Sequence, residues 1–217
     1  DAVGWHIGFR IWHQSFTDLD AFPVYRRTLE EHAAQVAGPG VEVVVHGLRP
    51  GSYPEGVAPM DANRHPYVKY LGGQQICEGV LAAEAAGYDA FTLGCIFDPG
   101  LQAARSLVDI PVVSLAETCM LVACSLGRKF ALVALNDFQK AEIEDRAREY
   151  GLTQRLAAAT TMQPVFNLFA LEDETKVRDI RAGFQRACEA ALGAGAEVII
   201  PGDGVLNEFL FRSGTAT

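Results

Sequence analysis

Apolar and polar residues follow two different periods along this chain. Short apolar runs such as residues 41–46 (VEVVVH) and 130–135 (FALVAL) predict β-strands, and the longer stretches between the runs have the spacing of helices. Alternating strands and helices indicate an α/β protein with parallel sheets that are covered by helices on both faces. The predicted strands are residues 5–12, 41–46, 89–94, 111–115, 130–135, 156–162 and 196–201.

An internal repeat indicates how these elements are grouped. The segment EGVLAAEAAGYDAFTLGC, which ends at Cys95, aligns without gaps with RACEAALGAGAEVIIPGD, which ends at Asp203. In both segments an alanine-rich helix ends at a glycine and an apolar strand follows, although any two strand–helix units share some of this pattern. We therefore expect two similar lobes, each a small parallel sheet, with ligands at the carboxyl ends of the strands.

The lobes are predicted to divide the chain into residues 1–115 and 116–217. A C-terminal helix that returns to the first lobe is expected beyond the sequence given. If the lobes face each other about a pseudo-twofold axis, Cys95 and Asp203 lie on opposite sides of one cleft.

Cys95 is the first candidate for chemistry. It ends a predicted strand, and Asp98 with Pro99 resembles an N-cap followed by the first residue of a helix. A helix N-terminus stabilises a nearby thiolate, whereas the charge of Asp98 opposes it. The alternative is that Cys95 is a small core residue, which we expect of the remaining cysteines, Cys77, Cys119, Cys124 and Cys188.

Polar residues at other strand ends are further candidates. Asp203 lies in PGDGVLNE, where flanking glycines allow close backbone approach; it is either an ordinary turn acid or a carboxylate at the mouth of the second lobe. Side chains that follow the first strand of each lobe could hydrogen-bond a substrate. The expected substrate-binding residues are His13, Gln14, Ser15, Ile96, Phe97, Glu117, Thr118, Asn136 and Gly204.

Charge and composition narrow the ligand class. The 217 residues are 49% hydrophobic and carry a formal net charge of -9, which argues against nucleic acid or an anionic membrane as partner and favours a small molecule. We find no membrane-spanning stretch and no signal peptide, and the odd number of unpatterned cysteines is typical of a reducing compartment, so we expect a cytoplasmic protein. Apolar residues expected on the helix surfaces favour a homodimer or a higher homo-oligomer.

Several familiar motifs are missing from the sequence. There is no GxGxxG after the first strand, no Walker A loop, no GxSxG and no HExxH, and the histidines lack the spacing of metal ligands. We therefore expect no cofactor and no metal.

One segment resembles a known family. Residues 94–135, GCIFDPGLQAARSLVDIPVVSLAETCMLVACSLGRKFALVAL, are similar to the central part of the aspartate/glutamate/hydantoin racemase superfamily, most closely its hydantoin and allantoin racemase branch. The similarity extends from about Gly72 to Asn207. The shared features are a strand-end cysteine, a DPG turn, an arginine in the next helix (Arg105), a D-I-P-V strand start, an acid after it (Glu117) and a glycine before the next strand (Gly127).

The resemblance implies two pseudo-symmetric Rossmann-like lobes, no cofactor, and two cysteines that flank the substrate's α carbon. One thiolate would remove a proton, and the opposite thiol would return one. Cys95 occupies the first position, but the second, expected in an L-G-C motif, is Asp203 here. An aspartate donates a proton poorly at pH 7 unless burial raises its pKa.

Several functions therefore stay open. We expect a cofactor-independent racemase or isomerase that moves a proton at a carbon next to a carbonyl, in a hydantoin, an amino acid or a related carboxylate or imide. Superfamily members with a single cysteine imply the alternatives of an arylmalonate-type decarboxylase or a maleate-type cis/trans isomerase. Residues 12–15, WHQS, replace the family's N-P-N-S/T and favour a bulkier substrate. A binding protein that lost the chemistry is the alternative from another class.

Overall fold

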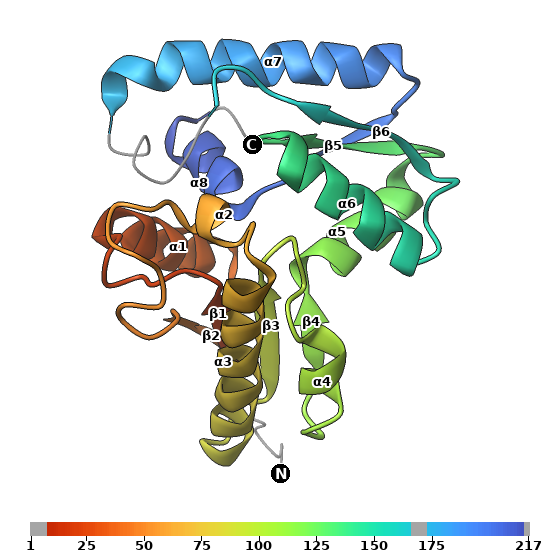
Figure 1. The fold of residues 1–217 in the computed structure, drawn as a ribbon. Helices are drawn as coiled ribbons and strands as arrows, with labels where there is room; N and C mark the ends of the chain where they lie inside the picture. Colours follow the sequence, from red (N-terminus) through yellow and green to blue (C-terminus); the bar gives the residue numbers. More distant parts are fainter. Residues whose placement is uncertain (1–7, 166–172, 215–217) are drawn as a thin grey trace.

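The computed structural model describes residues 8–165 and 173–214, which form two parallel sheets in separate lobes (Figure 1). The first sheet has the strand order β2-β1-β3-β4 and the second β6-β5-β7. The sheets confirm the predicted α/β class. The strands are β1 (Phe9–Ser15), β2 (Val41–His46), β3 (Ala90–Gly94), β4 (Val112–Ser114), β5 (Phe130–Ala134), β6 (Leu156–Thr161) and β7 (Val198–Pro201).

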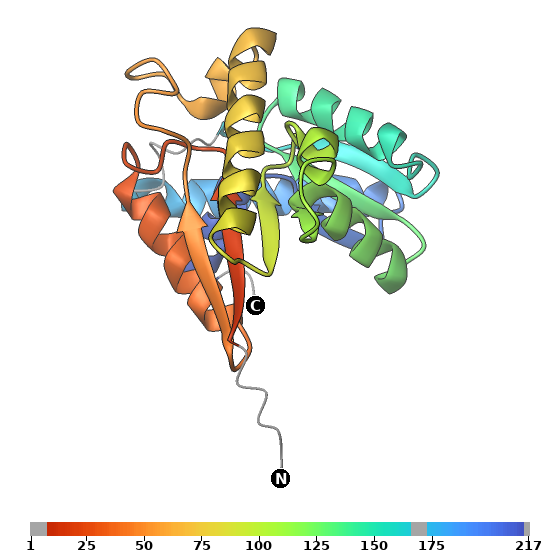
Figure 2. The same cartoon turned by 90° about the horizontal axis from the view of Figure 1, so that it is seen from below.

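Helices cover the sheets, with α1 and α3 on either side of the first sheet (Figures 1 and 2). Prolines begin α1, α2 and α3, where their missing N–H and fixed φ suit the first helical turn. None of the helices in the described ranges is long and apolar enough to cross a bilayer. The helices are α1 (Pro23–Val36), α2 (Pro59–Ala62), α3 (Pro66–Ala85), α4 (Leu101–Arg105), α5 (Leu115–Leu126), α6 (Asp137–Glu149), α7 (Val177–Gly193) and α8 (Gly204–Arg212), with a 3-10 turn at Glu174–Lys176.

Three elements differ from the predictions. The helix expected to have Asp98 as its N-cap begins only at Leu101, and Gly100 is its N-cap. β1 runs through Ser15, because it pairs with β2 up to Gln14 and with β3 up to Ser15; residues 5–7 of the predicted strand lie outside the described residues. A C-terminal helix was predicted only beyond the sequence given, yet α8 follows the last strand within it and packs against α1. The division into domains at residue 115 stays a prediction, although β4 of the first sheet ends at Ser114.

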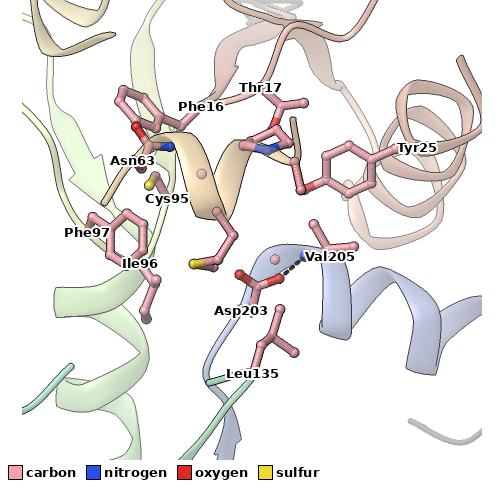
Figure 3. Close-up of a pocket in the computed structure, with 15 residues that line it drawn as sticks. Phe16, Thr17, Tyr25, Asn63, Cys95, Ile96, Phe97, Leu135, Asp203 and Val205 are labelled. Atoms are coloured by element: carbon pink, nitrogen blue, oxygen red, sulfur yellow. Dashed lines mark hydrogen bonds between the residues drawn. The ribbon is translucent and has the colours of Figure 1, made fainter. Parts of the chain in front are cut away.

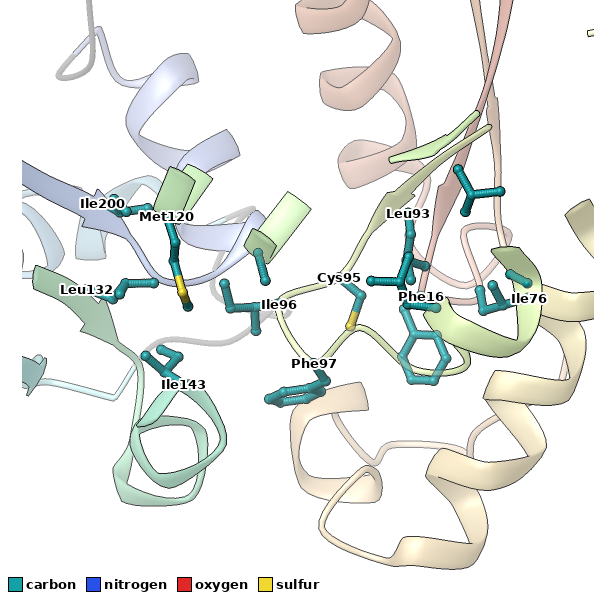
Figure 4. Packing of buried hydrophobic residues seen from close by; sticks show 14 of the residues in the cluster. Phe16, Ile76, Leu93, Cys95, Ile96, Phe97, Met120, Leu132, Ile143 and Ile200 are labelled. Carbon is teal, nitrogen blue, oxygen red and sulfur yellow. The ribbon is translucent and has the colours of Figure 1, made fainter. Parts of the chain in front are cut away.

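One hydrophobic cluster continues from the first sheet into the second (Figure 4). Leu93 belongs to the first sheet and Leu132 to the second, and both lie in this cluster. Ile96, just beyond β3, lies between them and faces Met120 of α5 (Figure 4). Burying a side chain of this size stabilises a fold by about 1.5 to 3 kcal/mol, so the segment after β3 is anchored in the second lobe as well as the first.

Candidate active site

A cavity of about 70 Å³ lies between the carboxyl ends of strands from both lobes (Figure 3). Its walls are the segments that follow β1, β3, β5 and β7, together with α2 and the first turn of α1. Most of the lining is apolar. The polar side chains among the lining residues are Thr17, Tyr25, Asn63, Cys95 and Asp203.

Cys95 follows β3 directly and is 9% exposed. The backbone N–H of Phe97 lies beside its sulfur and favours the thiolate. Burial has the larger effect and raises the pKa of the thiol well above its ordinary value, and the charges of Asp98 and Asp203 raise it further. Burial therefore favours the neutral thiol at pH 7, which gives up its proton only to a strongly basic group such as a carbanion.

Asp203 begins α8 as its N-cap and is 7% exposed. Its Oδ1 accepts hydrogen bonds from the backbone N–H groups of Val205 (2.8 Å) and Leu206 (3.2 Å). Its Oδ2 accepts one from Nε2 of Gln139 at 2.7 Å. Burial has the larger effect and raises the pKa of Asp203, while these three donors oppose the rise because they favour the ionised form.

These hydrogen bonds leave Asp203 little capacity to accept further hydrogen bonds. Each carboxylate oxygen has two lone pairs, so two donors saturate Oδ1 and one lone pair of Oδ2 stays available. A proton or one substrate N–H can be accepted there.

Local geometry supports the correspondence between Cys95 and Asp203. Each follows the last residues of a parallel strand, and the amide two positions later, Phe97 or Val205, favours the ionised form of each. Both line the same cavity (Figure 3). The two lobes therefore present a thiol and a carboxyl group to one enclosed space.

Three further residues expected at the site also line the cavity: Ile96, Phe97 and Gly204. Gly204 is constrained by the cavity wall, because a Cβ there would lie 3.2 Å from the hydroxyl of Tyr25. Glycine at this position thus lets α8 begin close to α1.

The residues of β1 expected at the site do not line the cavity. Nδ1 of His13 lies 2.9 Å from Oγ1 of Thr92, and burial, with the charge of His46, lowers the pKa of His13 to about 4. Gln14 accepts a hydrogen bond from Nε1 of Trp12 at 2.9 Å, and Ser15 is buried. Oε1 of Gln14 packs against α3, where a Cβ on Gly79 would lie 3.0 Å from it.

Three other expected residues also lie outside the cavity lining. Glu117 accepts a hydrogen bond from Nη2 of Arg105, and Thr118 is exposed on α5. Oδ1 of Asn136 caps α6 by accepting from the N–H of Gln139 at 2.9 Å. Helix capping and ion pairing within the fold occupy Asn136 and Glu117, so the cavity is reached by other side chains.

Several residues at the site were not predicted from the sequence: Thr17, Tyr25 and Asn63 of the cavity lining, and Gln139, which binds Asp203. Tyr25 lies in the first turn of α1, and burial raises the pKa of its phenol, as do the nearby carboxylates of Asp203 and Glu208. Nothing in an amphipathic helix distinguishes such a tyrosine from a core residue. Gln139 has a signal, because Asn136 with a glutamine three residues later has the spacing of a capping box. Its side chain instead accepts from the N–H of Leu135 and donates to Asp203.

The segment between β2 and α3 closes the cavity. Met60 of α2 lines the cavity and packs against both hydrophobic clusters. The hydroxyl of Tyr53 donates to the carbonyl of Phe16 at 2.8 Å, and Nδ2 of Asn63 donates to that hydroxyl at 3.2 Å. These contacts hold the covering segment against the end of β1.

Among the described residues, no lysine, arginine or histidine lines the cavity. A carboxylate ligand would be desolvated there beside Asp203 without a compensating cation, which is costly. The lining suits an uncharged molecule with N–H and C=O groups.

Comparison with known proteins places the chain in a family. Residues 23–208 match the Asp/Glu/Hydantoin racemase family, and the chain belongs to that family. Hydantoin racemase from Pseudomonas sp. (strain NS671) is 34% identical over 144 residues, which are 66% of this chain and 56% of that protein. The chain spans about half the length of the curated relatives it matches.

Solved structures show the same fold. Allantoin racemase from Pseudomonas fluorescens superposes with a TM-score of 0.74 at 27% identity, over 95% of this chain and 83% of that one. Allantoin racemase from Klebsiella pneumoniae gives a TM-score of 0.75 at 23% identity, over 95% of this chain and 80% of that one. The two-lobed fold agrees with the resemblance seen in the sequence. The names of these relatives, hydantoin racemase and allantoin racemase, agree with the branch to which that resemblance pointed.

Proposed function

We propose that this chain carries the site of a cofactor-independent racemase or isomerase that moves a proton at a carbon next to a carbonyl. The observation that carries the proposal is the pair of proton-transferring groups, Cys95 and Asp203, which reach one cavity from different lobes. Two-base proton transfer requires a group on each face of the carbon, one protonated and one not. A neutral thiol opposite a hydrogen-bonded carboxylate meets that requirement.

In the forward step, Oδ2 of Asp203 removes the proton from the carbon, and the electron pair moves into the adjacent carbonyl to give an enolate. The S–H of Cys95 then delivers its proton to the opposite face. The site ends as a thiolate and a carboxylic acid, and the reverse reaction or exchange with solvent restores it. Tyr25, Thr17 and Asn63 are the side chains available to stabilise the enolate oxygen.

We further propose that the substrate is an uncharged cyclic imide or ureide of the hydantoin type. The absence of cations from the described lining supports a neutral substrate over a free amino acid. The names of the relatives, hydantoin racemase and allantoin racemase, support the same class.

A single-thiol reaction is the second candidate, because the second cysteine of the two-thiol mechanism is Asp203 here. A decarboxylase would use Cys95 only to protonate the carbanion left by loss of CO2, and a maleate-type isomerase would use it as a nucleophile. Both substrates are dianions, which the cavity lining disfavours. Cytoplasmic location and homo-oligomerisation stay predictions.

Solvent deuterium distinguishes these functions. Hydantoins, allantoin, amino acids, aryl malonates and maleate would each be incubated with the protein in D2O and followed by NMR and chiral chromatography. A racemase incorporates label into recovered substrate and inverts it, whereas a decarboxylase labels only its product. Deuterium uptake confined to malonates, or none with any compound despite ligand-induced thermal stabilisation, would contradict the proposed racemase.

A further inference from the structure

A short turn carries the reactive thiol, and its conformation is unusual. Residues 95–98, here called the thiol turn, include Asp98, whose φ of 47° makes it the only non-glycine residue with a positive φ in the described part of the chain. Aspartate adopts this left-handed conformation more readily than most residues, but it still needs support from its surroundings. The N–H of Asp98 donates to the carbonyl of Cys95 at 3.3 Å and closes the turn.

The support for Asp98 comes from two directions. Oγ of Ser114, at the end of β4, donates to Oδ1 of Asp98 at 2.6 Å. The hydroxyl of Tyr150, at the C-terminal end of α6, donates to Oδ2. Asp98 is only 5% exposed, so both hydrogen bonds are shielded from competing water. The side chain therefore ties the thiol turn to both lobes.

The chain is also fixed two residues beyond the thiol turn, at Gly100. Gly100 has a φ of 72°, and a Cβ there would lie 3.0 Å from the carbonyl oxygen of Gly73 in α3. Backbone contact with α3 on one side and the two side-chain hydrogen bonds on the other leave the turn little freedom. The amide of Phe97 is consequently held beside the sulfur of Cys95, where it favours the thiolate.

We propose that Asp98 is a positioning residue: its bonds to Ser114 and Tyr150 hold the thiol turn so that the Phe97 amide faces the Cys95 sulfur. Asp98 does not line the cavity and acts only through the turn. The inference rests on the proposed function in that Cys95 is taken as the reactive group. In this inference, the hydrogen bond from Tyr150 to Asp98 links the second lobe to the thiol turn of the first.

The first test follows the Phe97 amide by hydrogen exchange in the NMR spectrum, which requires no substrate. Asp98→Ala and Tyr150→Phe should accelerate exchange of this amide by about tenfold or more relative to wild type. Asp98→Asn should stay near wild type, because asparagine also tolerates the left-handed conformation and its amide can pair with both hydroxyls. Asp98→Gly removes the backbone strain without restoring the hydrogen bonds, and should behave like Asp98→Ala.

Asp89→Ala is the matched control. Asp89 precedes β3 at the end remote from Cys95, and its Oδ2 accepts from the N–H of Arg10 at 2.7 Å. Its loss should destabilise the first sheet without a selective effect on Phe97. If Asp98→Ala, Asp98→Gly and Tyr150→Phe leave Phe97 exchange within about twofold of wild type, or change it only together with every amide of β3 as Asp89→Ala does, the inference is wrong.

The second test uses kinetics. Asp98→Ala should lower kcat for deuterium incorporation by about tenfold or more with little change in KM, because a displaced thiol impairs proton transfer more than binding. Asp98→Asn should restore most of kcat. An equal rise in KM, or no rescue by asparagine, would overturn the positioning role. If the wild-type protein turns over no substrate, the proposed function fails, while the Phe97 exchange still decides the inference.

Discussion

The thiol turn after β3 and the start of α8 after β7 occupy equivalent places in the two lobes but are stabilised differently. Asp203 caps its helix directly, and donors from its own lobe take three of its four acceptor positions. Cys95 has the Phe97 amide beside its sulfur, and α4 begins only at Leu101. The carboxylate is thus held by local structure, whereas the thiol depends on contacts that reach Ser114 and Tyr150.

This difference indicates which group can change its protonation at low cost. The thiol has few donors near it, so it is neutral until a ligand or a neighbour stabilises the anion. The carboxylate has its donors in place before any ligand binds, which is the preorganisation that favours a base in an enclosed site. In the proposed mechanism, the thiol is therefore the acid and the carboxylate is the base.

The largest effect is expected from Cys95→Ser. A serine hydroxyl is a much weaker acid than a thiol, so deuterium exchange should fall by about a hundredfold or more. Thermal stabilisation by the same ligand should persist, because the cavity lining barely changes. Full exchange activity in this variant would show that the thiol is not the proton donor.

Asp203→Asn tests the other side of the comparison. Loss of the carboxylate should lower exchange by about a hundredfold. The single variant also places an amide N–H against Nε2 of Gln139, with a stability cost of about 1 to 3 kcal/mol, measurable by urea denaturation.

The double variant Asp203→Asn with Gln139→Glu separates these two effects. It reverses the donor and acceptor across the buried contact, so stability should recover while exchange stays low. Recovery of exchange together with stability would show that residue 203 only caps the helix, and the acid–base comparison would then be wrong.

A smaller effect is expected from Tyr25→Phe. Tyr25 lies on the Asp203 side of the cavity, whereas Asn63 lies near Cys95 (Figure 3). If its hydroxyl stabilises the enolate oxygen, kcat/KM should fall by about tenfold, with the thermal midpoint nearly unchanged. Asn63→Ala is the companion from the other side, and an unchanged kcat/KM in Tyr25→Phe would shift that role away from the tyrosine.

The last prediction concerns stability rather than activity, namely the dependence of the free energy of unfolding on pH. Burial raises the pKa of Asp98 from its ordinary 3.8 to about 6, despite the hydrogen bonds from Ser114 and Tyr150. The folded protein therefore binds more protons than the unfolded chain between these values, and the Asp98 contribution to stability falls as pH rises from about 4 to 6. Asp98→Asn lacks this dependence.

The free energy of unfolding of wild type relative to Asp98→Asn should consequently increase by about 2 kcal/mol between pH 7 and pH 4. His13, with its pKa lowered to about 4, contributes the opposite slope, but it does so in both proteins and cancels. Denaturation by urea at pH 4, 5, 6 and 7 measures the difference. A difference that is constant with pH would mean that Asp98 titrates near its ordinary value.

Strand and helix periods, the internal repeat and the DPG segment were sufficient to predict the α/β class, the family and the two strand-end residues Cys95 and Asp203. These features are local, because periodicity and turn chemistry depend on residues close in sequence. The helix that follows Asp203 was not predicted, because an aspartate between glycines is typical of a turn as well as of an N-cap.

Tertiary structure alone decided which side chains reach the cavity. His13 and Gln14 were expected there, but β1 pairs with both neighbouring strands at these positions; His13 contacts Thr92 of β3 and Gln14 packs against α3. Packing of segments that are distant in the sequence brings Tyr25 beside the start of α8, Gln139 beside Asp203 and Tyr150 beside Asp98. Sequence sets the local conformation of each segment, whereas the contents of a cavity between lobes depend on how those segments meet.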